Sequence, residues 1–230
     1  MEYIEGQTLT QWLIDNPKPD LETVRAIVEQ IARGLSAFHR MEMLHQDIRP
    51  ENVMIDKTGT VKIIDFGSVK VAGVVEASQP TDHNDILGTV QYTAPEYFLG
   101  ESGSPRSDLF SLGVITYQML TGNLPYGSQA ARARSKSQQK KLKYKSAIDE
   151  NREIPIWLDG ALRRAVQPDP YKRYEELSEY VFDLRHPNAK YFAPAFTPLM
   201  ERNPLLFWQG LSFILACTIL LLLVVQCGAR

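Results

Sequence analysis

The sequence is poor in cysteine and has no excess of charge of one sign. Its two cysteines, Cys217 and Cys227, both lie in the apolar C-terminal part. A disulfide framework for the rest of the chain is therefore excluded, and a reducing compartment is indicated. The 25 basic and 27 acidic residues give a net charge of -2, which argues against a general nucleic-acid binder. The first ten residues show neither a basic start nor an apolar run, so no secretory signal is expected.

The sequence has the composition of a globular domain, with 44% hydrophobic and 23% charged residues. Its clearest element is a helix over residues 21–40, where apolar residues recur at the three-and-four spacing of one buried stripe. Asp20 precedes this stripe and is the expected N-cap. Further helices are predicted over residues 8–16, part of 130–148, 158–166 and 174–184.

Two short β-branched segments, residues 52–55 and 61–64, predict a tight hairpin with Gly59 at its turn. Residues 65–96 lack periodicity, which favours a long functional loop. From Ser107 onward the sequence is apolar nearly all round, which predicts a helix buried at the centre of a helical domain.

The C-terminal part contains a long uncharged run. Residues 205–225 hold no charged side chain, and crossing a bilayer takes about 20 apolar residues. The run predicts a transmembrane helix over 205–226, preceded by a linker over 187–204 that is rich in proline and aromatics. A buried core helix is the alternative. Arg202 and Arg230 flank the run, so the flanking charge barely decides its orientation.

Three motifs follow one another in the first half of the chain. HQDIRPEN, residues 45–52, places Asn52 five positions after Asp47, DFG occupies residues 65–67, and APE occupies residues 94–96. With a hairpin between the first two, this order resembles the C-terminal lobe of a protein kinase of the serine/threonine type. Taken singly, each Asp or Asn is equally consistent with turn chemistry.

The resemblance implies roles in transfer of a phosphoryl group from ATP. Asp47 would accept the proton of the acceptor hydroxyl, and Asn52 and Asp65 would hold Mg²⁺, which prefers oxygen ligands. Arg49 stands where these kinases often carry a phosphate-directed lysine, and Thr89 matches the loop residue that contacts the catalytic Asp.

The resemblance also implies a hinge and a set of supporting residues. Residues 1–6 look like the hinge, in which the backbone of Glu2 and Ile4 would bind the adenine edge. The matched supporting residues are His45 and Phe66 of a stacked apolar column, Asp108 beneath the catalytic loop, and the pair Glu96 and Arg173.

The chain departs from the family pattern in two respects. Gln46 replaces the usual Arg, so a charge-assisted pair with a phosphorylated loop residue is not available. No two glycines lie two positions apart, which excludes a G-x-G-x-x-G loop, and no V-A-I-K strand can be placed. The chain is therefore expected to be a piece of a longer kinase. This piece lacks the N-lobe and is expected to be inactive alone.

These observations predict an α+β, mainly α fold: a kinase-like C-lobe over residues 7–186 with small β-hairpins, plus one membrane helix. The expected function is a serine/threonine-protein kinase lobe that uses ATP and Mg²⁺ on a protein substrate. The kinase lobe is expected on the cytoplasmic side of the cell (inner) membrane, attached by a single membrane span. No nucleic acid is expected as a partner. A membrane-anchored pseudokinase scaffold is the alternative.

Two further features complete the expectations. The arrangement resembles bacterial fusions in which a PP2C-type phosphatase domain precedes a kinase that ends in a membrane helix, so an N-terminal phosphatase domain is an implied partner. Residues 128–146 hold seven basic residues and no acid. This run suits acidic substrates or anionic lipid, or forms a solvated helix face.

Overall fold

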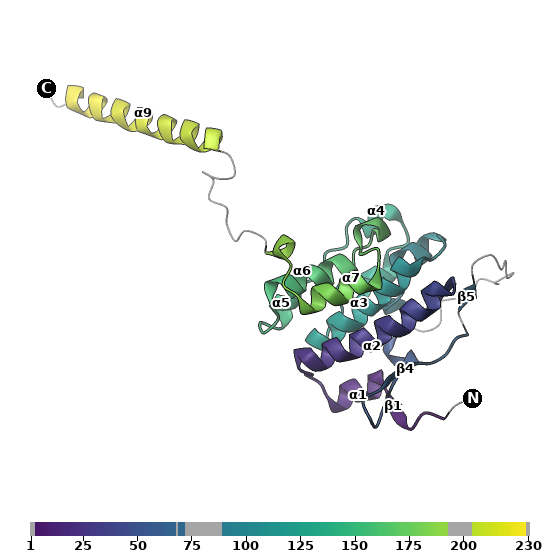
Figure 1. The fold of residues 1–230 in the computed structure, drawn as a ribbon. Coiled ribbons are helices and arrows are strands. Elements are labelled where there is room, and N and C mark those ends of the chain that lie inside the picture. The colour runs from purple at the N-terminus through teal and green to yellow at the C-terminus, as the bar shows by residue number, and fades with distance from the viewer. Residues whose placement is uncertain (1–2, 68, 72–88, 193–203, 229–230) are drawn as a thin grey trace. The chain divides into compact units, whose positions relative to one another are not determined.

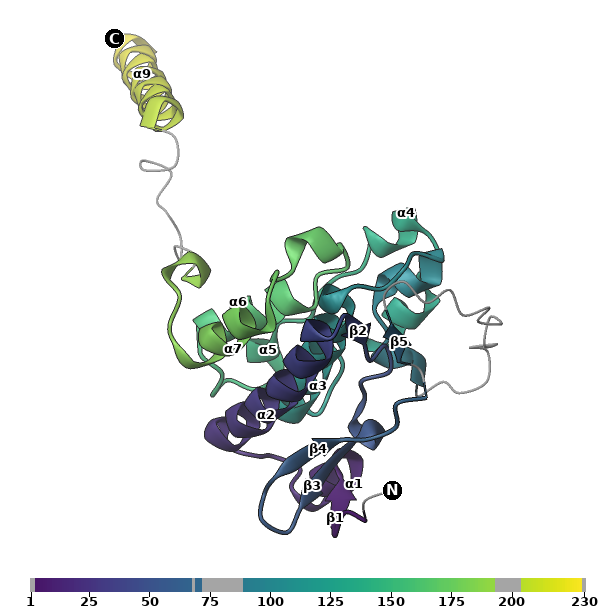
Figure 2. The same cartoon turned by 45° about the vertical axis from the view of Figure 1, so that its right-hand side comes forward.

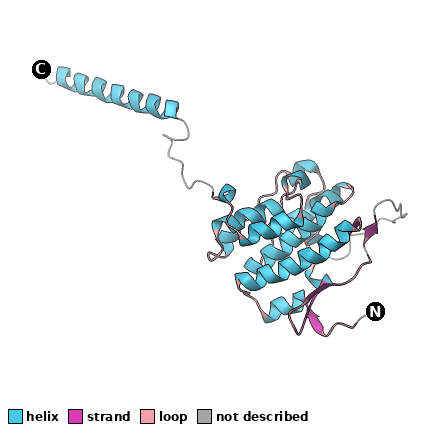
Figure 3. Cartoon of the chain, in the orientation of Figure 1, coloured by secondary structure: helices cyan, strands magenta, loops and turns pink. Residues whose placement is uncertain are grey.

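The computed structural model describes residues 3–67, 69–71, 89–192 and 204–228, without the side chains of 70–71, 89, 204 and 220–228. The chain divides into two compact units, Met1–Tyr191 and Phe192–Arg230. The first unit is mainly helical and carries short strands (Figures 1 and 3). The predicted boundaries at 186/187 and 204/205 remain predictions.

Helix α2, Leu21–Arg40, confirms the helix predicted over residues 21–40. It begins where the Asp20 carboxylate accepts a hydrogen bond from the Thr23 amide at 2.9 Å, which satisfies one of the free N–H groups of the first turn. Its apolar stripe, including Val28, Ile31 and Leu35, is fully buried. The stripe packs on helices α3 and α7 and on strand β4.

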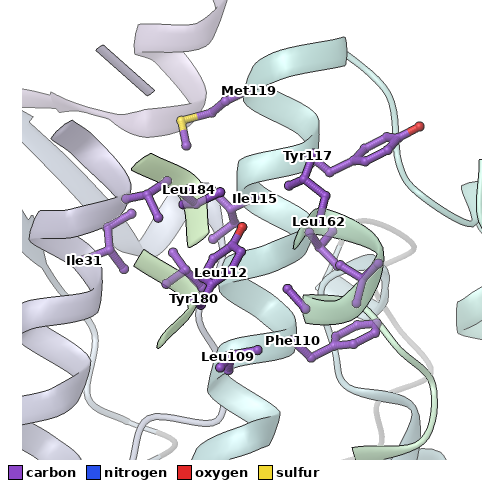
Figure 4. Close-up of a cluster of buried hydrophobic side chains, with 14 of the residues drawn as sticks. Ile31, Leu109, Phe110, Leu112, Ile115, Tyr117, Met119, Leu162, Tyr180 and Leu184 are labelled. Atoms are coloured by element: carbon purple, nitrogen blue, oxygen red, sulfur yellow. The ribbon is translucent and has the colours of Figure 1, made fainter. Parts of the chain in front are cut away.

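Helix α3, Pro105–Thr121, is the buried central helix that the apolar sequence predicts. It begins two residues before Ser107, because proline suits a first helical turn and Ser104 forms a capping box with Ser107. It ends at Gly122, whose φ of 71° is left-handed. Figure 4 shows its side chains meeting Ile31 of α2 and Leu184 of α7.

Helices α6, Ile156–Ala165, and α7, Leu177–Arg185, pack on each other beside α3. They confirm the helices predicted over 158–166 and 174–184, with shifted first residues. The approach of α3 to α6 is close because Gly113 has no side chain, and a Cβ added there would meet Ala165 at 2.9 Å.

The small sheet has the order β1-β3-β4 and is antiparallel. Strands β3, Val53–Asp56, and β4, Val61–Ile63, form the predicted hairpin, with Gly59 at φ 83° in its turn. Strand β1, Gly6–Thr8, is not predicted by the sequence analysis. Figure 2 shows the three strands together below α2.

A second strand pair joins β2, Met43–Leu44, to β5, Lys70–Val71. It is also not predicted, because two residues are too few to show a period. The remaining elements are α1 Leu9–Asp15, η1 Pro50–Asn52, η2 Thr89–Gln91, η3 Pro95–Leu99, η4 Gly127–Arg132, α4 Lys136–Gln139, α5 Ala147–Glu150, η5 Pro170–Lys172, η6 Ala189–Tyr191 and α9 Pro204–Gly228. Within the predicted loop 65–96, residues 72–88 lie outside the described residues.

The predicted fold class and localisation are wrong where they include a membrane helix. The run over 205–226 does form a helix, α9. A membrane span needs sufficient length and sufficient apolar character together, and no helix has both in the part of the chain that the structure describes. The prediction rested on the absence of charge together with a length of about 20 residues. The first unit remains as predicted, mainly helical with a small sheet.

Candidate active site

The loop that follows β2 is held from below by Asp108, in the first turn of α3. The carboxylate of Asp108 accepts the backbone N–H groups of His45 at 3.0 Å and Gln46 at 2.9 Å. The ring of His39, in the last turn of α2, lies 2.9 Å from the same carboxylate. Asp108 is 1% exposed, so three polar contacts compensate for its burial.

Two non-glycine residues of the site have left-handed backbone conformations. Gln46 has φ 67° and Asp65 has φ 62°. Such conformations cost free energy in residues with a Cβ, and they persist where surrounding contacts impose them. At Gln46 the hydrogen bond from its amide to Asp108 is one such contact.

Asn52 ties η1 to the loop that carries Asp47. Its side-chain amide donates to the backbone carbonyl of Asp47 at 2.8 Å and to the Asp47 carboxylate at 3.0 Å. Asn52 is 5% exposed. Its own carbonyl accepts the Ile64 N–H at 2.9 Å, which connects the loop to the residue before Asp65.

The carboxyl group of Asp47 is electrostatically unusual. Burial raises its pKa, and the negative charge of Asp65 acts in the same direction. The opposing influences are the charge of Arg49 and the hydrogen bond from Asn52. A carboxylate with a raised pKa takes up a proton more readily, which suits a general base.

The residues Phe66 and His45 lie together with Phe38 of α2. The Phe38 and Phe66 rings stack with centroids 5.3 Å apart, and the His45 ring meets Phe66 edge-on at 5.9 Å. Burial lowers the pKa of His45 against the influence of Asp108, so the ring favours its neutral form. Phe66 is 54% exposed, so one side of this aromatic group faces solvent.

Glu96 and Arg173 form a buried, bidentate ion pair. Their two N–O distances are 2.8 and 2.7 Å, and their side chains are 3% and 0% exposed. The Ser107 hydroxyl also donates to Glu96 at 2.7 Å. The remaining bonds of the guanidinium go to the backbone carbonyls of Gln167, Arg106 and Pro168. The pair therefore joins η3 to the start of α3 and to η5.

The other predicted site residues are placed less completely. Arg49 precedes η1, with its Nε 3.6 Å from the Glu51 carboxylate. Ile4 lies before β1 and is half-buried. Thr89 begins η2, but its side chain is not among those described, and Glu2 lies outside the described residues.

Sequence reasoning missed His39 and Phe38, which lie side by side at the end of α2. The helical stripe marks residue 38 as buried, and His39 is a basic residue in the last helical turn. Neither signal names a partner, because Phe66 and Asp108 are distant in sequence. The contact between His39 and Asp108 exists only because the fold brings the last turn of α2 beside the first turn of α3.

A family model described as "Protein kinase domain" matches residues 1–182, and the chain therefore belongs to the protein kinase domain family.

Two similar relatives come from bacteria. The chain is 31% identical over 186 residues to the serine/threonine-protein kinase PrkC of Bacillus subtilis, covering 80% of this chain and 28% of the relative. It is 33% identical over 204 residues to the serine/threonine-protein kinase PknL of Mycobacterium tuberculosis, covering 88% and 50%. The chain thus spans between about a quarter and a half of the relatives' lengths.

Proposed function

We propose that this lobe transfers the γ-phosphoryl group of ATP to serine or threonine hydroxyls of a protein substrate. The observation that carries the proposal is the Asn52 amide, which holds both the backbone and the carboxylate of Asp47 while Asp65 lies close enough to influence the Asp47 pKa. A lobe that only binds a partner has no physical need for this grouping.

Asp47 is the proposed proton acceptor. The acceptor hydroxyl would pass its proton to the Asp47 carboxylate as its oxygen bonds to the γ-phosphorus of ATP, while the bond from that phosphorus to the β–γ bridging oxygen breaks and ADP leaves. One hydrogen bond from Asn52 holds that carboxylate and a second holds the Asp47 backbone carbonyl, and Asp108 fixes the backbone leading into it. Arg49 supplies a positive charge beside Asp47, suited to a phosphate oxygen.

The residues present suit Mg²⁺. The side-chain nitrogen of Asn52 donates to Asp47, which leaves the side-chain oxygen, Oδ1, as the atom for a cation. The Asp65 carboxylate is exposed. No cluster of three or more His, Cys, Asp or Glu exists among the described residues, and Mg²⁺ needs only one or two carboxylates because it keeps waters. When bound, the ion neutralises charge on the triphosphate.

The 230 residues hold no two glycines two positions apart, and so no glycine-rich loop. We therefore propose that they bind ATP weakly by themselves and transfer phosphate only when joined to a segment with that loop and a strand lysine. A pseudokinase scaffold is the competing function, favoured by the same missing loop. The predicted phosphatase partner rests on resemblance alone.

The test joins these residues to the glycine-loop and strand-lysine segment of a related kinase. Transfer of radiolabelled phosphate from Mg-ATP to protein is measured for the fusion and for its Asp47→Asn variant. We expect the variant to lose roughly 10²- to 10⁴-fold in rate, the usual contribution of a general base. Asp149→Asn, at an exposed position of α5, is the matched control and should keep its rate.

Binding of nucleotide separates the two functions. The enzyme proposal expects Mg-ATP to raise the unfolding temperature of the fusion, with a smaller rise without Mg²⁺. No rise, together with rates equal in the fusion and in Asp47→Asn, would support the scaffold. Turnover by the 230 residues alone that disappears in Asp47→Asn would contradict the requirement for an added segment.

A further inference from the structure

The basic run that the sequence singled out forms a continuous exposed surface on the first unit. We name it the basic strip: Arg132, Arg134, Lys136, Lys140, Lys141, Lys143 and Lys145, all exposed. It includes helix α4 and the segment that follows it, near the label α4 in Figure 2. A helix face does not account for it, because α4 covers only residues 136–139.

The segment after α4 presents its charges in alternation. Lys141, Lys143 and Lys145 are exposed, whereas Leu142 and Tyr144 between them are half-buried and pack against the hydrophobic core. Lys141 lies in a turn closed by the hydrogen bond from its backbone N–H to the Gln138 carbonyl at 3.0 Å, and residues 142–146 form no regular element. The three lysines are thus exposed within five residues, while the two side chains between them pack inward.

Nearby carboxylates do not neutralise these lysines. The Asp159 carboxylate accepts hydrogen bonds from the Tyr144 hydroxyl at 2.9 Å and the Ser146 hydroxyl at 3.0 Å, and no ion pair between it and a lysine of the strip occurs among the described residues. Within the strip, Lys136 pairs with Glu101 at 2.8 Å. For Lys141, Lys143 and Lys145, no described carboxylate lies at ion-pair distance.

The strip is anchored to η3. The side chain of Gln139, 7% exposed, donates to the carbonyl of Pro95 at 2.6 Å. The Arg134 guanidinium lies over the Phe98 ring, 4.9 Å from its centroid. The Lys136 pair with Glu101 adds a contact just past η3.

The segment that includes η3 also approaches the catalytic loop. The carbonyl of Tyr92, three residues before Pro95, accepts the Ser111 hydroxyl of α3 at 2.8 Å. Burial raises the pKa of Tyr92 to about 12, and the charges of Glu51 and Arg49 also act on its hydroxyl. Residues 92–98 thus connect the surroundings of Arg49 to the basic strip.

We propose that the basic strip docks an acidic segment of the protein substrate, an inference that rests on the proposed function. Three exposed ammonium groups within five residues, none at ion-pair distance from a described carboxylate, offer complementary charge to an acidic segment. An anionic lipid surface fits less well. Surface-binding segments insert apolar side chains beside their charges, and here Leu142 and Tyr144 pack inward.

The experiment measures binding of a fluorescent peptide to the 230-residue chain by anisotropy, without nucleotide. The peptide alternates Glu and Ala around one Ser, and a second peptide has Gln in place of every Glu. We expect tighter binding of the Glu peptide, weakened by added salt. The triple variant Lys141→Gln, Lys143→Gln, Lys145→Gln should bind it about tenfold more weakly, since each exposed pair contributes modestly.

The matched control is Lys18→Gln, Lys172→Gln, Lys190→Gln, which removes three exposed lysines elsewhere and should keep full binding. Circular dichroism and unfolding temperature check that both variants fold. Equal binding of the two peptides, or an equal loss in both triple variants, would overturn the proposal. So would loss of binding to phosphatidylserine vesicles with peptide binding unchanged. Because no nucleotide is present, failure here leaves the phosphoryl-transfer test unaffected.

Discussion

The charged side chains that hold the loops of this lobe are buried and hydrogen-bonded, whereas the side chains proposed to act on ATP include the exposed carboxylate of Asp65. We call the first set the anchor region and the second the reactive region. The anchor region is Glu96, Asp108 and Arg173, and the reactive region is Asp47, Asn52 and Asp65. In the anchor region, every carboxylate accepts at least two hydrogen bonds.

Two features mark the reactive region. Burial raises the Asp47 pKa, and Asp65 has a left-handed backbone. Both features oppose folding, and both suit groups that must take up a proton or bind a cation. The comparison indicates that the stability of this lobe comes from elsewhere than its proposed catalytic groups, as trade-offs between activity and stability lead one to expect.

The largest stability effect should come from breaking the anchor region. Arg173→Gln leaves the Glu96 carboxylate buried without its bidentate partner. Removal of one member of a buried ion pair typically costs about 3–5 kcal/mol. We expect the free energy of unfolding, measured by urea denaturation of the chain, to fall by that amount.

Arg185→Gln is the control for that experiment, because Arg185 pairs with Glu29 at 2.8 Å on the surface, where its side chain is 37% exposed. An exposed pair contributes less than about 1 kcal/mol. Equal losses in the two variants would show that the anchor region has no special role and would remove the contrast.

A smaller effect concerns backbone strain beside the reactive region. Gln46→Gly and Gln46→Ala both remove the side chain, but only glycine accepts the φ of 67° without cost. We expect the Gly variant to be more stable than the Ala variant by about 1 kcal/mol in urea denaturation. The difference between them reports the backbone alone.

Arg33, an exposed residue within α2, provides the matched pair for that measurement. At a helical position the order reverses, so Arg33→Ala should exceed Arg33→Gly in stability by about 1 kcal/mol. If alanine is also preferred at position 46, the left-handed conformation there is not a source of strain.

The sequence predicts those parts of the lobe whose signals are local. The stripe over 21–40, the turn at Gly59 and the motif spacing each lie within a short stretch, and the structure brings Asp47 and Asn52 into contact. What it does not predict depends on pairing between distant segments. Strand β1 is three residues long, too short for periodicity, and its register is set by β3 nearly 50 residues later.

The same limit explains His39 and the membrane prediction. The partner of His39, Asp108, is 69 residues away, so no local pattern connects them. The membrane prediction for 205–226 used the length of the run and its lack of charge, and no helix in the described part of the chain is long and apolar enough for a span. The motif residues could be predicted because the family resemblance supplied the three-dimensional context that local patterns lack.

The smallest predicted effect is a pH dependence of stability whose sign differs between the carboxylates of Asp47 and Asp20. The Asp47 pKa is raised in the folded state, so its contribution to stability is full below the ordinary Asp pKa of about 3.9 and is lost as pH rises through the folded value. Asp47→Asn lacks this loss, and its amide oxygen still accepts a hydrogen bond from Asn52. Relative to the unsubstituted chain, the variant should therefore gain stability as pH rises from 4 to 7.

Asp20→Asn should show the opposite trend. Hydrogen bonds from Thr23 lower the Asp20 pKa, so that carboxylate stabilises the chain above its ordinary pKa and the contribution is lost as pH falls. The Asn variant should then lose relative stability as pH rises. Unfolding temperatures of the three chains across this pH range give both trends. Parallel trends in the two variants would mean that the folded chain stabilises the Asp47 carboxylate as it does the N-cap carboxylate of Asp20, and the proposed electrostatic difference of Asp47 would fail.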